Sequence, residues 1–287
     1  MTRNQRLRAL IQRPEILVAP GVYDAFLARC VARAGFEAVY MTGAGVSHSR
    51  LGAPDLGLLS FSEMVEQAGR IADAVDLPVI ADADTGYGNA MNVARTIRAY
   101  ERAGVSACHI EDQQTPKRCG HFDEKRLVPL VEMIGKLHAA LDARIDADFV
   151  IIARTDARTV VGLDAAMERA HALAEAGADM IFVESPLTEA ELETIGQHVT
   201  CPLLANMVEG GKTPILPASE LEALGFSVVI HPGALGRLIG KQVEAFLHRL
   251  REEGTTMSQL DRMLTFTEQN EIVDLPGFLE RSKKYRE

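Results

Sequence analysis

Three carboxylates follow two neighbouring apolar runs of this sequence, and together they could hold a metal ion. Asp82 and Asp84 come directly after one run, and Glu111 ends the next. On a continuing strand, side chains two positions apart point to the same side, and two carboxylates that close repel each other unless a cation separates them. Such an oxygen-rich site suits Mg²⁺, or alternatively Mn²⁺, better than zinc. The alternative for Asp84 is capping of the following helix.

A cysteine lies among cationic side chains shortly after the second run. Cys119 is flanked by Lys117, Arg118 and His121. Positive neighbours favour a thiolate, so the sequence predicts a lowered pKa for this thiol. Gly120 should make the segment mobile, and a mobile loop could close over a bound substrate. The alternative is an ordinary exposed loop that happens to contain a cysteine. A metal site beside a reactive thiol indicates an enzyme.

The scaffold that must position these groups is indicated by a repeated alternation along the chain. Short runs rich in Val, Ile and Ala are each followed by a longer amphipathic stretch, which is typical of a parallel sheet buried on both faces. Eight such units predict an α/β fold of the (β/α)8 TIM barrel type. The expected strands are 17–19, 38–41, 79–81, 107–110, 149–153, 180–183, 203–205 and 227–230. The expected helices include 25–34, 61–74, 89–103, 125–143, 163–176, 189–198, 218–224 and 234–253.

Polar residues end nearly every expected strand, where barrel enzymes build their active sites. This rim comprises Thr42-Gly43-Ala44-Gly45, Asp82, Asp84, Glu111, Arg154-Thr155-Asp156, Glu184, Asn206 and His231. The glycine-rich segment can hold a carboxylate or phosphate oxygen on free N–H groups, or be a plain turn. The guanidinium of Arg154 matches a substrate carboxylate, and an ion pair with Glu184 or Asp156 is the alternative. Asp55, on the loop after the second strand, is a further metal candidate.

Composition excludes several classes of protein. The chain has 287 residues, of which 47% are hydrophobic, enough for one barrel domain spanning 1–287. A lone barrel does not need the expected helical tail, 254–287, which could pack on another subunit. The net charge of −10 argues against a nucleic-acid partner. Without a membrane-length apolar run or a CxxC spacing, we expect a cytoplasmic protein with no membrane partner.

The motifs resemble those of the isocitrate lyase / phosphoenolpyruvate mutase superfamily, in its small-enzyme branch of 2-methylisocitrate and 2,3-dimethylmalate lyases. They are Gly52-x-Pro54-Asp55-Leu56-Gly57, Asp82-Ala83-Asp84-Thr85-Gly86-Tyr87-Gly88, His109-Ile110-Glu111-Asp112-Gln113, Lys117-Arg118-Cys119-Gly120-His121 and Ala153-Arg154-Thr155-Asp156-Ala157. The resemblance runs from about residue 20 to 256. It implies a (β/α)8 barrel whose last helix is exchanged between subunits, usually in a homotetramer. That exchange would account for the C-terminal tail.

The resemblance also implies roles for the rim residues. Asp82 and Asp84 would hold Mg²⁺, with Asp55 and Glu111 in its water shell, and Cys119 would be the acid/base on a gating loop. The predicted metal set is Asp82, Asp84, Glu111 and Asp55. The predicted catalytic residues are Cys119, Arg154, Glu111 and Tyr40. The predicted substrate-binding residues are Thr42, Gly43, Ala44, Asp82, Gly120, His121, Arg154, Glu184, Asn206 and Arg237.

Cys119 favours carbon–carbon cleavage, because lyases of this family carry it in that loop and the phosphorus–carbon enzymes typically lack it. The expected reaction is Mg²⁺-dependent cleavage of a substituted malate (a 2-hydroxy di- or tricarboxylate) to pyruvate or a related 2-oxo acid plus a carboxylate. Thr42-Gly43-Ala44 replaces the usual Ser-Gly-Gly, and Phe266, near Arg262, stands where a tail Arg is expected; both argue against methylisocitrate. Segment 206–214 looks more like the alkylmalate- and oxaloacetate-cleaving relatives.

Four alternatives to that reaction stay open. Three are enzymes: an oxaloacetate hydrolase or decarboxylase, a 2-methylisocitrate lyase, and a carboxyphosphonoenolpyruvate-type phosphonomutase. The fourth is a catalytically silent barrel that binds 2-oxo acids. The intact set of Asp82, Asp84, Glu111 and Cys119 argues against the silent barrel.

Overall fold

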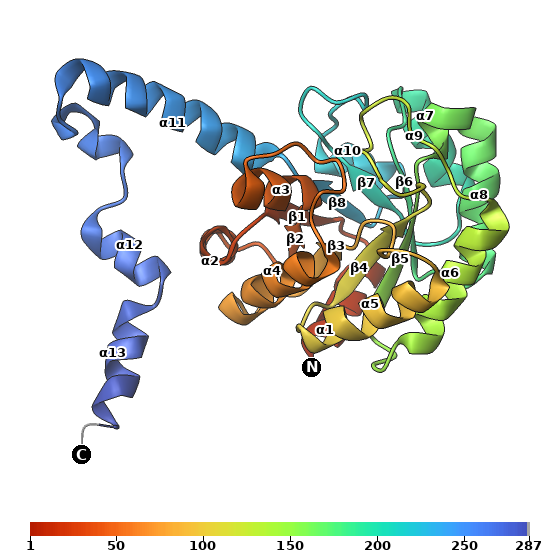
Figure 1. Ribbon diagram of the computed structural model, residues 1–287, viewed down its shortest axis with the longest axis horizontal. Helices are drawn as coiled ribbons and strands as arrows, with labels where there is room; N and C mark the ends of the chain where they lie inside the picture. Colours follow the sequence, from red (N-terminus) through yellow and green to blue (C-terminus); the bar gives the residue numbers. More distant parts are fainter. Residues whose placement is uncertain (286–287) are drawn as a thin grey trace.

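The computed structural model describes residues 1–285 and shows parallel strands arranged as a barrel (Figure 1). The eight strands lie in the order β6-β5-β4-β3-β2-β1-β8-β7, and a parallel bridge from Ile181 to Leu203 joins β6 to β7 and completes the ring. The strands are β1 (Leu17–Val22), β2 (Val39–Met41), β3 (Val79–Asp82), β4 (Ala107–Glu111), β5 (Val150–Thr155), β6 (Met180–Val183), β7 (Leu204–Asn206) and β8 (Val228–His231). The predicted (β/α)8 barrel is confirmed.

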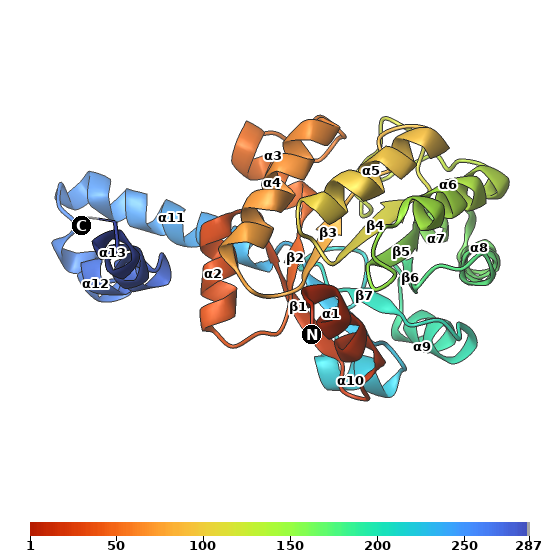
Figure 2. The same cartoon turned by 90° about the horizontal axis from the view of Figure 1, so that it is seen from below.

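Helices surround this ring, as the second view shows (Figure 2). Those of the barrel are α1 (Arg3–Gln12), α2 (Ala25–Arg33), α3 (Gly43–Leu51), α4 (Phe61–Ala74), α5 (Ala90–Arg102), α6 (Leu130–Ala143), α7 (Ala157–Val161), α8 (Leu163–Glu175), α9 (Glu189–His198) and α10 (Ala218–Ala223). The C-terminal part comprises α11 (Ala234–Glu253), the 3₁₀ helix η1 (Met257–Arg262), α12 (Phe266–Ile272) and α13 (Leu275–Lys283).

The barrel wall is apolar on both faces, which explains the continuous hydrophobic runs in the sequence. Ile80 and Ile152 pack inside the barrel, where Leu7 of α1 joins them, whereas Ala81 and Ile151 pack outward against the helices. Successive side chains of a strand point to opposite faces, and every position of β3 and β5 is buried. Full burial of one such aliphatic side chain contributes roughly 1.5–3 kcal/mol before entropy is counted.

Several element boundaries differ from the sequence-based prediction. Helices α3 and α7 were not expected, and the helix predicted from residue 125 begins only at Leu130, after Pro129 at its N-cap. Asp84 lies beyond the end of β3 in a left-handed backbone conformation (φ 47°) and so does not continue the strand. The alternative of a capping role for Asp84 is wrong, because Asn89 caps α5 by accepting the N–H groups of Met91 and Asn92.

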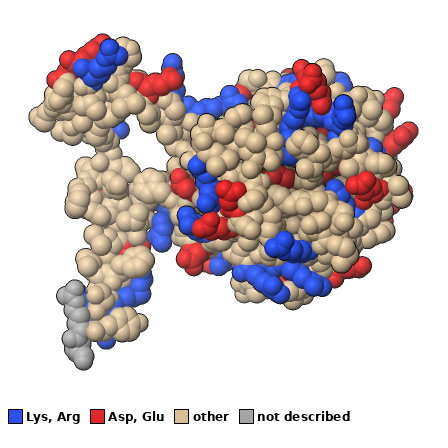
Figure 3. All heavy atoms as spheres, viewed as in Figure 1, with Lys and Arg blue, Asp and Glu red and all other residues tan. Residues whose placement is uncertain are grey.

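The C-terminal part leaves the barrel and lies apart from it for most of its length (Figures 1 and 2). Helix α11 has no buried residue. The chain then returns to α2 through α12, where Ile272 is buried and Arg33 pairs with Glu271 at 3.4 Å. Much of this segment is neither acidic nor basic at its surface (Figure 3). Residues 286 and 287 of the predicted tail lie outside the described residues. Among residues 1–285, no helix combines the length and apolarity that crossing a membrane requires.

Candidate active site

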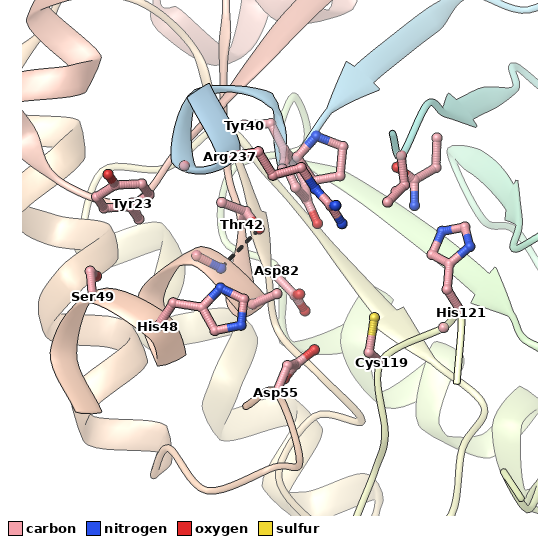
Figure 4. Close-up of a pocket in the computed structure, with 18 of the residues that line it drawn as sticks. Tyr23, Tyr40, Thr42, His48, Ser49, Asp55, Asp82, Cys119, His121 and Arg237 are labelled. Carbon is pink, nitrogen blue, oxygen red and sulfur yellow. Dashed lines mark hydrogen bonds between the residues drawn. The ribbon is translucent and has the colours of Figure 1, made fainter. Parts of the chain in front are cut away.

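A cavity of about 690 Å³ opens at the C-terminal ends of the strands. Of the predicted site residues, it is lined by Tyr40, Thr42, Ala44, Asp55, Asp82, Cys119, Gly120, His121, Arg154, Glu184, Asn206 and Arg237. Figure 4 shows the sulfur of Cys119 between Asp55 and His121, with Asp82 and Thr42 across the cavity. Gly43, Asp84 and Glu111 lie behind this wall and contact the lining residues. The structure therefore brings the predicted set into one site.

The carboxylate of Asp82 is fixed by backbone N–H groups. Its Oδ1 accepts from the N–H of Asp84 at 2.9 Å, and its Oδ2 accepts from the N–H of Gly43 at 3.2 Å. Gly43 begins α3, and a Cβ there would collide with Asp82 Oδ2, so this close approach requires glycine. Thr42 caps α3 through its Oγ, which accepts from Gly45 at 3.2 Å. The glycine-rich segment is thus a helix N-terminus whose first N–H already binds Asp82.

Lys117 neutralises two carboxylates beside Asp82. Its Nζ lies 2.6 Å from Asp55 Oδ1 and 2.8 Å from Asp84 Oδ1. Burial raises the pKa of Asp84 to about 6 in spite of this ion pair. The corner formed by Asp55, Asp82 and Asp84 therefore holds more acidic groups than cations.

This acidic corner fits a hydrated divalent cation. Among residues 1–285, no group of three or more His, Cys, Asp or Glu side chains is placed to hold a metal ion. Mg²⁺ characteristically uses one or two carboxylates and keeps several water ligands. Glu111 Oε1 is buried without a hydrogen-bond partner, so it is free to form a hydrogen bond with such a water. Asp82 and Asp84 would hold the ion, with Asp55 and Glu111 bonding its waters.

Arg154 lies at the centre of a second cluster. It pairs with Asp156 at 3.0 Å, with Glu184 at 3.2 Å and with Glu111 at 3.3 Å, and Lys125 pairs with Asp156 at 2.9 Å. The structural ion pairs weighed as the alternative role of Arg154 are therefore both present. Burial raises the pKa of Glu111 well above its ordinary range, so Arg154 and Lys125 balance the charges of Asp156 and Glu184.

Cys119 lies on the β4–α6 connection, whose residues 117–125 we call the lid. Its N–H donates to the carbonyl of Asp55 at 3.3 Å. Burial raises the pKa of its thiol, so the predicted lowering is wrong. The neighbouring cations explain the difference: the ammonium of Lys117 is bound to Asp55 and Asp84, and Arg118 pairs with Glu124 at 2.9 Å at the surface. The thiol therefore keeps its proton at neutral pH, the form that a general acid requires.

The lid packs tightly against the cluster around Arg154. A Cβ on Gly120 would lie 2.5 Å from Arg154 Nη2 and 2.6 Å from Glu184 Cγ, so only glycine fits. His121 Nε2 lies 3.4 Å from Glu184 Oε1, and burial lowers the pKa of this imidazole. Asn206 Nδ2 donates to Glu184 Oε2 at 3.1 Å. Glu184 therefore joins the lid to β6 and β7.

Tyr40 reaches the cavity from β2 with its hydroxyl 2.8 Å from His109 Nε2. Burial raises the pKa of Tyr40 well above its ordinary range and lowers the pKa of His109 to about 4. Both side chains are therefore neutral near pH 7. His109 also lies 3.7 Å from Asp82 Oδ1, which connects the phenol to the acidic corner.

Sequence reasoning missed some polar groups of the site. Lys125 is buried against Asp156, and the side chain of Gln113 brackets the backbone of Arg118 with hydrogen bonds of 2.8 and 2.9 Å. His48 of α3 also lines the cavity (Figure 4). Gln113 ends the motif around Glu111, and Lys125 is the first residue of the helix expected over 125–143. Neither position carries a sequence signal that marks it as part of the site.

Comparison with known proteins places this architecture in a family. The family model described as phosphoenolpyruvate phosphomutase matches residues 7–251. The chain is 48% identical over 285 residues to the 2,3-dimethylmalate lyase of Eubacterium barkeri, covering 99% of both chains. It is 47% identical over 261 residues to a probable 2-methylisocitrate lyase 2 of Corynebacterium glutamicum, covering 91% of this chain and 85% of that one.

Solved structures agree with the sequence relatives. Oxaloacetate acetylhydrolase in complex with the inhibitor 3,3-difluorooxalacetate superposes with a TM-score of 0.94 at 36% identity, covering 99% of this chain and 97% of that one. Phosphonopyruvate hydrolase in complex with oxalate and Mg²⁺ superposes with a TM-score of 0.89 at 32% identity, covering 100% and 99%. With the barrel, the acidic corner and the family match in agreement, the chain belongs to the phosphoenolpyruvate phosphomutase family.

Proposed function

We propose that the protein is a Mg²⁺-dependent carbon–carbon lyase that cleaves a substituted malate to pyruvate or a related 2-oxo acid and a carboxylate. One observation carries the proposal: the protonated thiol of Cys119 faces the same cavity as Asp82 and Arg154. Such a cleavage needs a protein carboxylate that holds the metal ion, a guanidinium that stabilises the developing negative charge, and a proton donor. The similarity to 2,3-dimethylmalate lyase supports this substrate class.

The substrate's 2-hydroxy acid end would lie toward the acidic corner. A divalent ion at Asp82 and Asp84 would supply the positive charge that lowers the pKa of the substrate hydroxyl. Thr42 and Ala44, at the N-terminus of the nine-residue helix α3, would face the first carboxylate. Tyr40, a neutral phenol, would donate a hydrogen bond to the oxygen that becomes the 2-oxo group.

Cleavage then moves two electron pairs and two protons. The hydroxyl gives its proton to a solvent water on the acidic side of the cavity, and the pair left on its oxygen forms the C2 carbonyl. The C2–C3 bond breaks at the same time, and its electron pair passes to C3. Cys119 protonates C3 and regains a proton from solvent after product release. Arg154, His121 and Asn206 would bind the second carboxylate, whose charge grows as the enolate forms. Closure of the lid, with Gly120 against Arg154, would keep water from the carbanion.

The cavity's charges favour a dicarboxylate over a tricarboxylate such as methylisocitrate. Arg154 would serve the second substrate carboxylate, and Lys117 is paired with Asp55 and Asp84. Within the described part of the chain, Arg237 is the least engaged cation of the cavity wall, with Glu209 3.9 Å away. A third substrate carboxylate would lack a partner of its own, and unpaired charge is costly in a cavity of low polarity.

The second candidate is hydrolysis of oxaloacetate on the same residues, which the similarity to oxaloacetate acetylhydrolase favours. Product analysis separates the two. With Mg²⁺, cleavage of 2,3-dimethylmalate yields pyruvate and propionate, hydrolysis of oxaloacetate yields oxalate and acetate, and its decarboxylation yields pyruvate and CO₂. Turnover of oxaloacetate alone would replace the lyase proposal. If the protein turned over no diacid but oxalate still raised its melting temperature, we would conclude that it binds such acids without catalysis.

Substitution of Cys119 tests its role in the proposed reaction. Cys119→Ser should lower lyase turnover by roughly 10²–10⁴-fold, the usual contribution of a positioned general acid, because the serine hydroxyl is a far weaker acid. Oxalate should still raise the melting temperature of the variant, since the thiol is not needed to hold that anion. Full lyase turnover by Cys119→Ser would remove the acid role.

We also propose that the whole chain, 1–287, works as one barrel unit in a cytoplasmic homotetramer, with 254–287 and α11 packed on a partner subunit. Support comes from α11, which leaves the barrel without a buried residue. It also comes from large apolar side chains left exposed along this part of the described chain. They include Leu238, Leu247, Met257, Leu260, Phe266, Phe278 and Leu279. Apolar patches of this extent are typical of subunit contacts.

A further inference from the structure

A second loop holds the lid, and its contacts involve the backbone more than side chains. Residues 210–212, which we call the latch, lie between β7 and α10. The N–H of Lys212 donates to His121 Nδ1 at 3.0 Å. The ammonium of Lys212 also lies 2.6 Å from Asp123 Oδ1, but Asp123 is exposed and such pairs contribute little. The backbone hydrogen bond to His121 is therefore the more important of the two contacts.

The hydrogen bond from Lys212 fixes the tautomer of His121. A ring nitrogen that accepts an N–H cannot carry a hydrogen itself, so the neutral ring must carry its hydrogen on Nε2. Nε2 lies 3.4 Å from Glu184 Oε1, the carboxylate that also pairs with Arg154 at 3.2 Å. Ser185 Oγ, 3.3 Å from Nδ1, can donate to the same acceptor. The latch thereby directs the imidazole N–H toward the cluster around Arg154.

The latch is also built to approach the imidazole closely. A Cβ on Gly211 would lie 2.8 Å from both Cε1 and Nδ1 of His121 and 3.0 Å from the carbonyl oxygen of Val208. That carbonyl accepts the N–H of Gly211 at 2.9 Å, which closes a tight turn. Any side chain at position 211 must push either the turn or His121 away. Glycine at this position therefore allows the latch to contact the lid.

We propose that Gly211 and the N–H of Lys212 are positioning elements that fix the His121 tautomer and hold the lid, with Cys119, over the cavity. The proposal rests on the proposed function only in that the lid carries its acid. The contacts predict that substitutions at these two neighbouring positions have different effects. Lys212→Ala keeps the backbone N–H and should act weakly, whereas Gly211→Ala displaces the imidazole and should act strongly.

Three measurements test the latch. Nitrogen-15 spectra of labelled histidine should show the Nε2–H tautomer for His121 in the wild-type protein and a change in Gly211→Ala. The rate of Cys119 alkylation by iodoacetamide, corrected with Cys119→Ala for the other thiols, should rise at least fivefold in Gly211→Ala. The kcat/KM of this variant for the cleaved diacid should fall at least tenfold, because both Cys119 and the imidazole of His121 move. Lys212→Ala should change each rate by less than about fivefold.

Gly69→Ala is the matched control, because its Cβ would meet only Ala103 at an ordinary 3.7 Å. It should leave all three readouts at wild-type values. A wild-type His121 with its hydrogen on Nδ1 would overturn the proposal without any variant. Wild-type alkylation and tautomer signals in Gly211→Ala would overturn it as well. If the wild-type protein turns over no diacid, the proposed function fails, while the alkylation and tautomer readouts still decide the latch.

Discussion

Gly120→Ala is the sharpest perturbation of the lid that the structure offers. The new Cβ would lie 2.5 Å from Arg154 Nη2 and 2.6 Å from Glu184 Cγ, where ordinary contacts begin at 3.4 Å. Arg154 and Glu184 are held by their buried ion pairs, so the lid must retreat by about 1 Å, taking Cys119 with it. A displacement of that size typically costs about 10²-fold in rate. That loss corresponds to roughly 3 kcal/mol of transition-state stabilisation.

The assay is kcat/KM for the diacid that the wild-type enzyme cleaves, measured together with the melting temperature. We expect kcat/KM to fall about 10²-fold while the melting temperature changes by no more than about 2 °C, because the lid can move outward without opening the core. Gly135→Ala is the control, since a Cβ there would have no atom within 4 Å and a helical alanine stabilises. A Gly120→Ala enzyme within threefold of wild type would refute the reasoning about lid position.

Three further predictions concern charge and assembly. Burial lowers the pKa of His109 from 6.5 to about 4 in the folded protein. As pH falls below 6.5, the unfolded chain therefore takes up this proton before the folded protein does. The free energy of unfolding that is present above pH 6.5 is lost progressively toward pH 4. Urea unfolding should show about 2 kcal/mol lost from this group between pH 7 and pH 5, and a smaller loss in His109→Gln. Mg²⁺ should raise the melting temperature of the wild-type protein and not that of Asp82→Asn, as scanning calorimetry can show. Leu247→Asp, at an exposed position of α11, should lower the assembly mass in light scattering, whereas Val131→Asp on α6 should not.

The barrel was predictable because its signals are local and repeated. Each strand is an apolar run buried on both faces, so the eight expected strands agree with the observed ones to within about three residues at each end. Helix α3 escaped prediction because its first turn, Gly43 to Gly45, has the composition of a turn. It forms because Thr42 caps it and because Asp82 accepts its first N–H, a contact 39 residues away in sequence. The helix propensity of residues 43–51 carries no information about that hydrogen bond.

The sequence allowed us to predict which residues form the candidate site, but not their ion pairs or the pKa of the Cys119 thiol. Residues at strand ends must meet at one rim, so the sequence could indicate that Asp82, Arg154 and Glu184 come together. It could not indicate which carboxylate each cation binds. The expected effect of Lys117 on Cys119 failed for this reason, because adjacency along a chain does not determine where a long side chain points. Burial then raised the pKa of the thiol, which neighbouring charges had been expected to lower.

The protonation state of Cys119 determines which chemistry this side chain can perform. A thiolate near Asp82 would be suited to nucleophilic attack or to proton abstraction, whereas a protonated thiol is suited to quenching a carbanion. By binding Asp55 and Asp84 rather than the thiol, Lys117 anchors the lid to the acidic corner and leaves Cys119 neutral. Opening the lid would withdraw that ammonium from two largely buried carboxylates, which is unfavourable. The same ion pairs that hold the ammonium of Lys117 on Asp55 and Asp84 therefore also favour the closed lid.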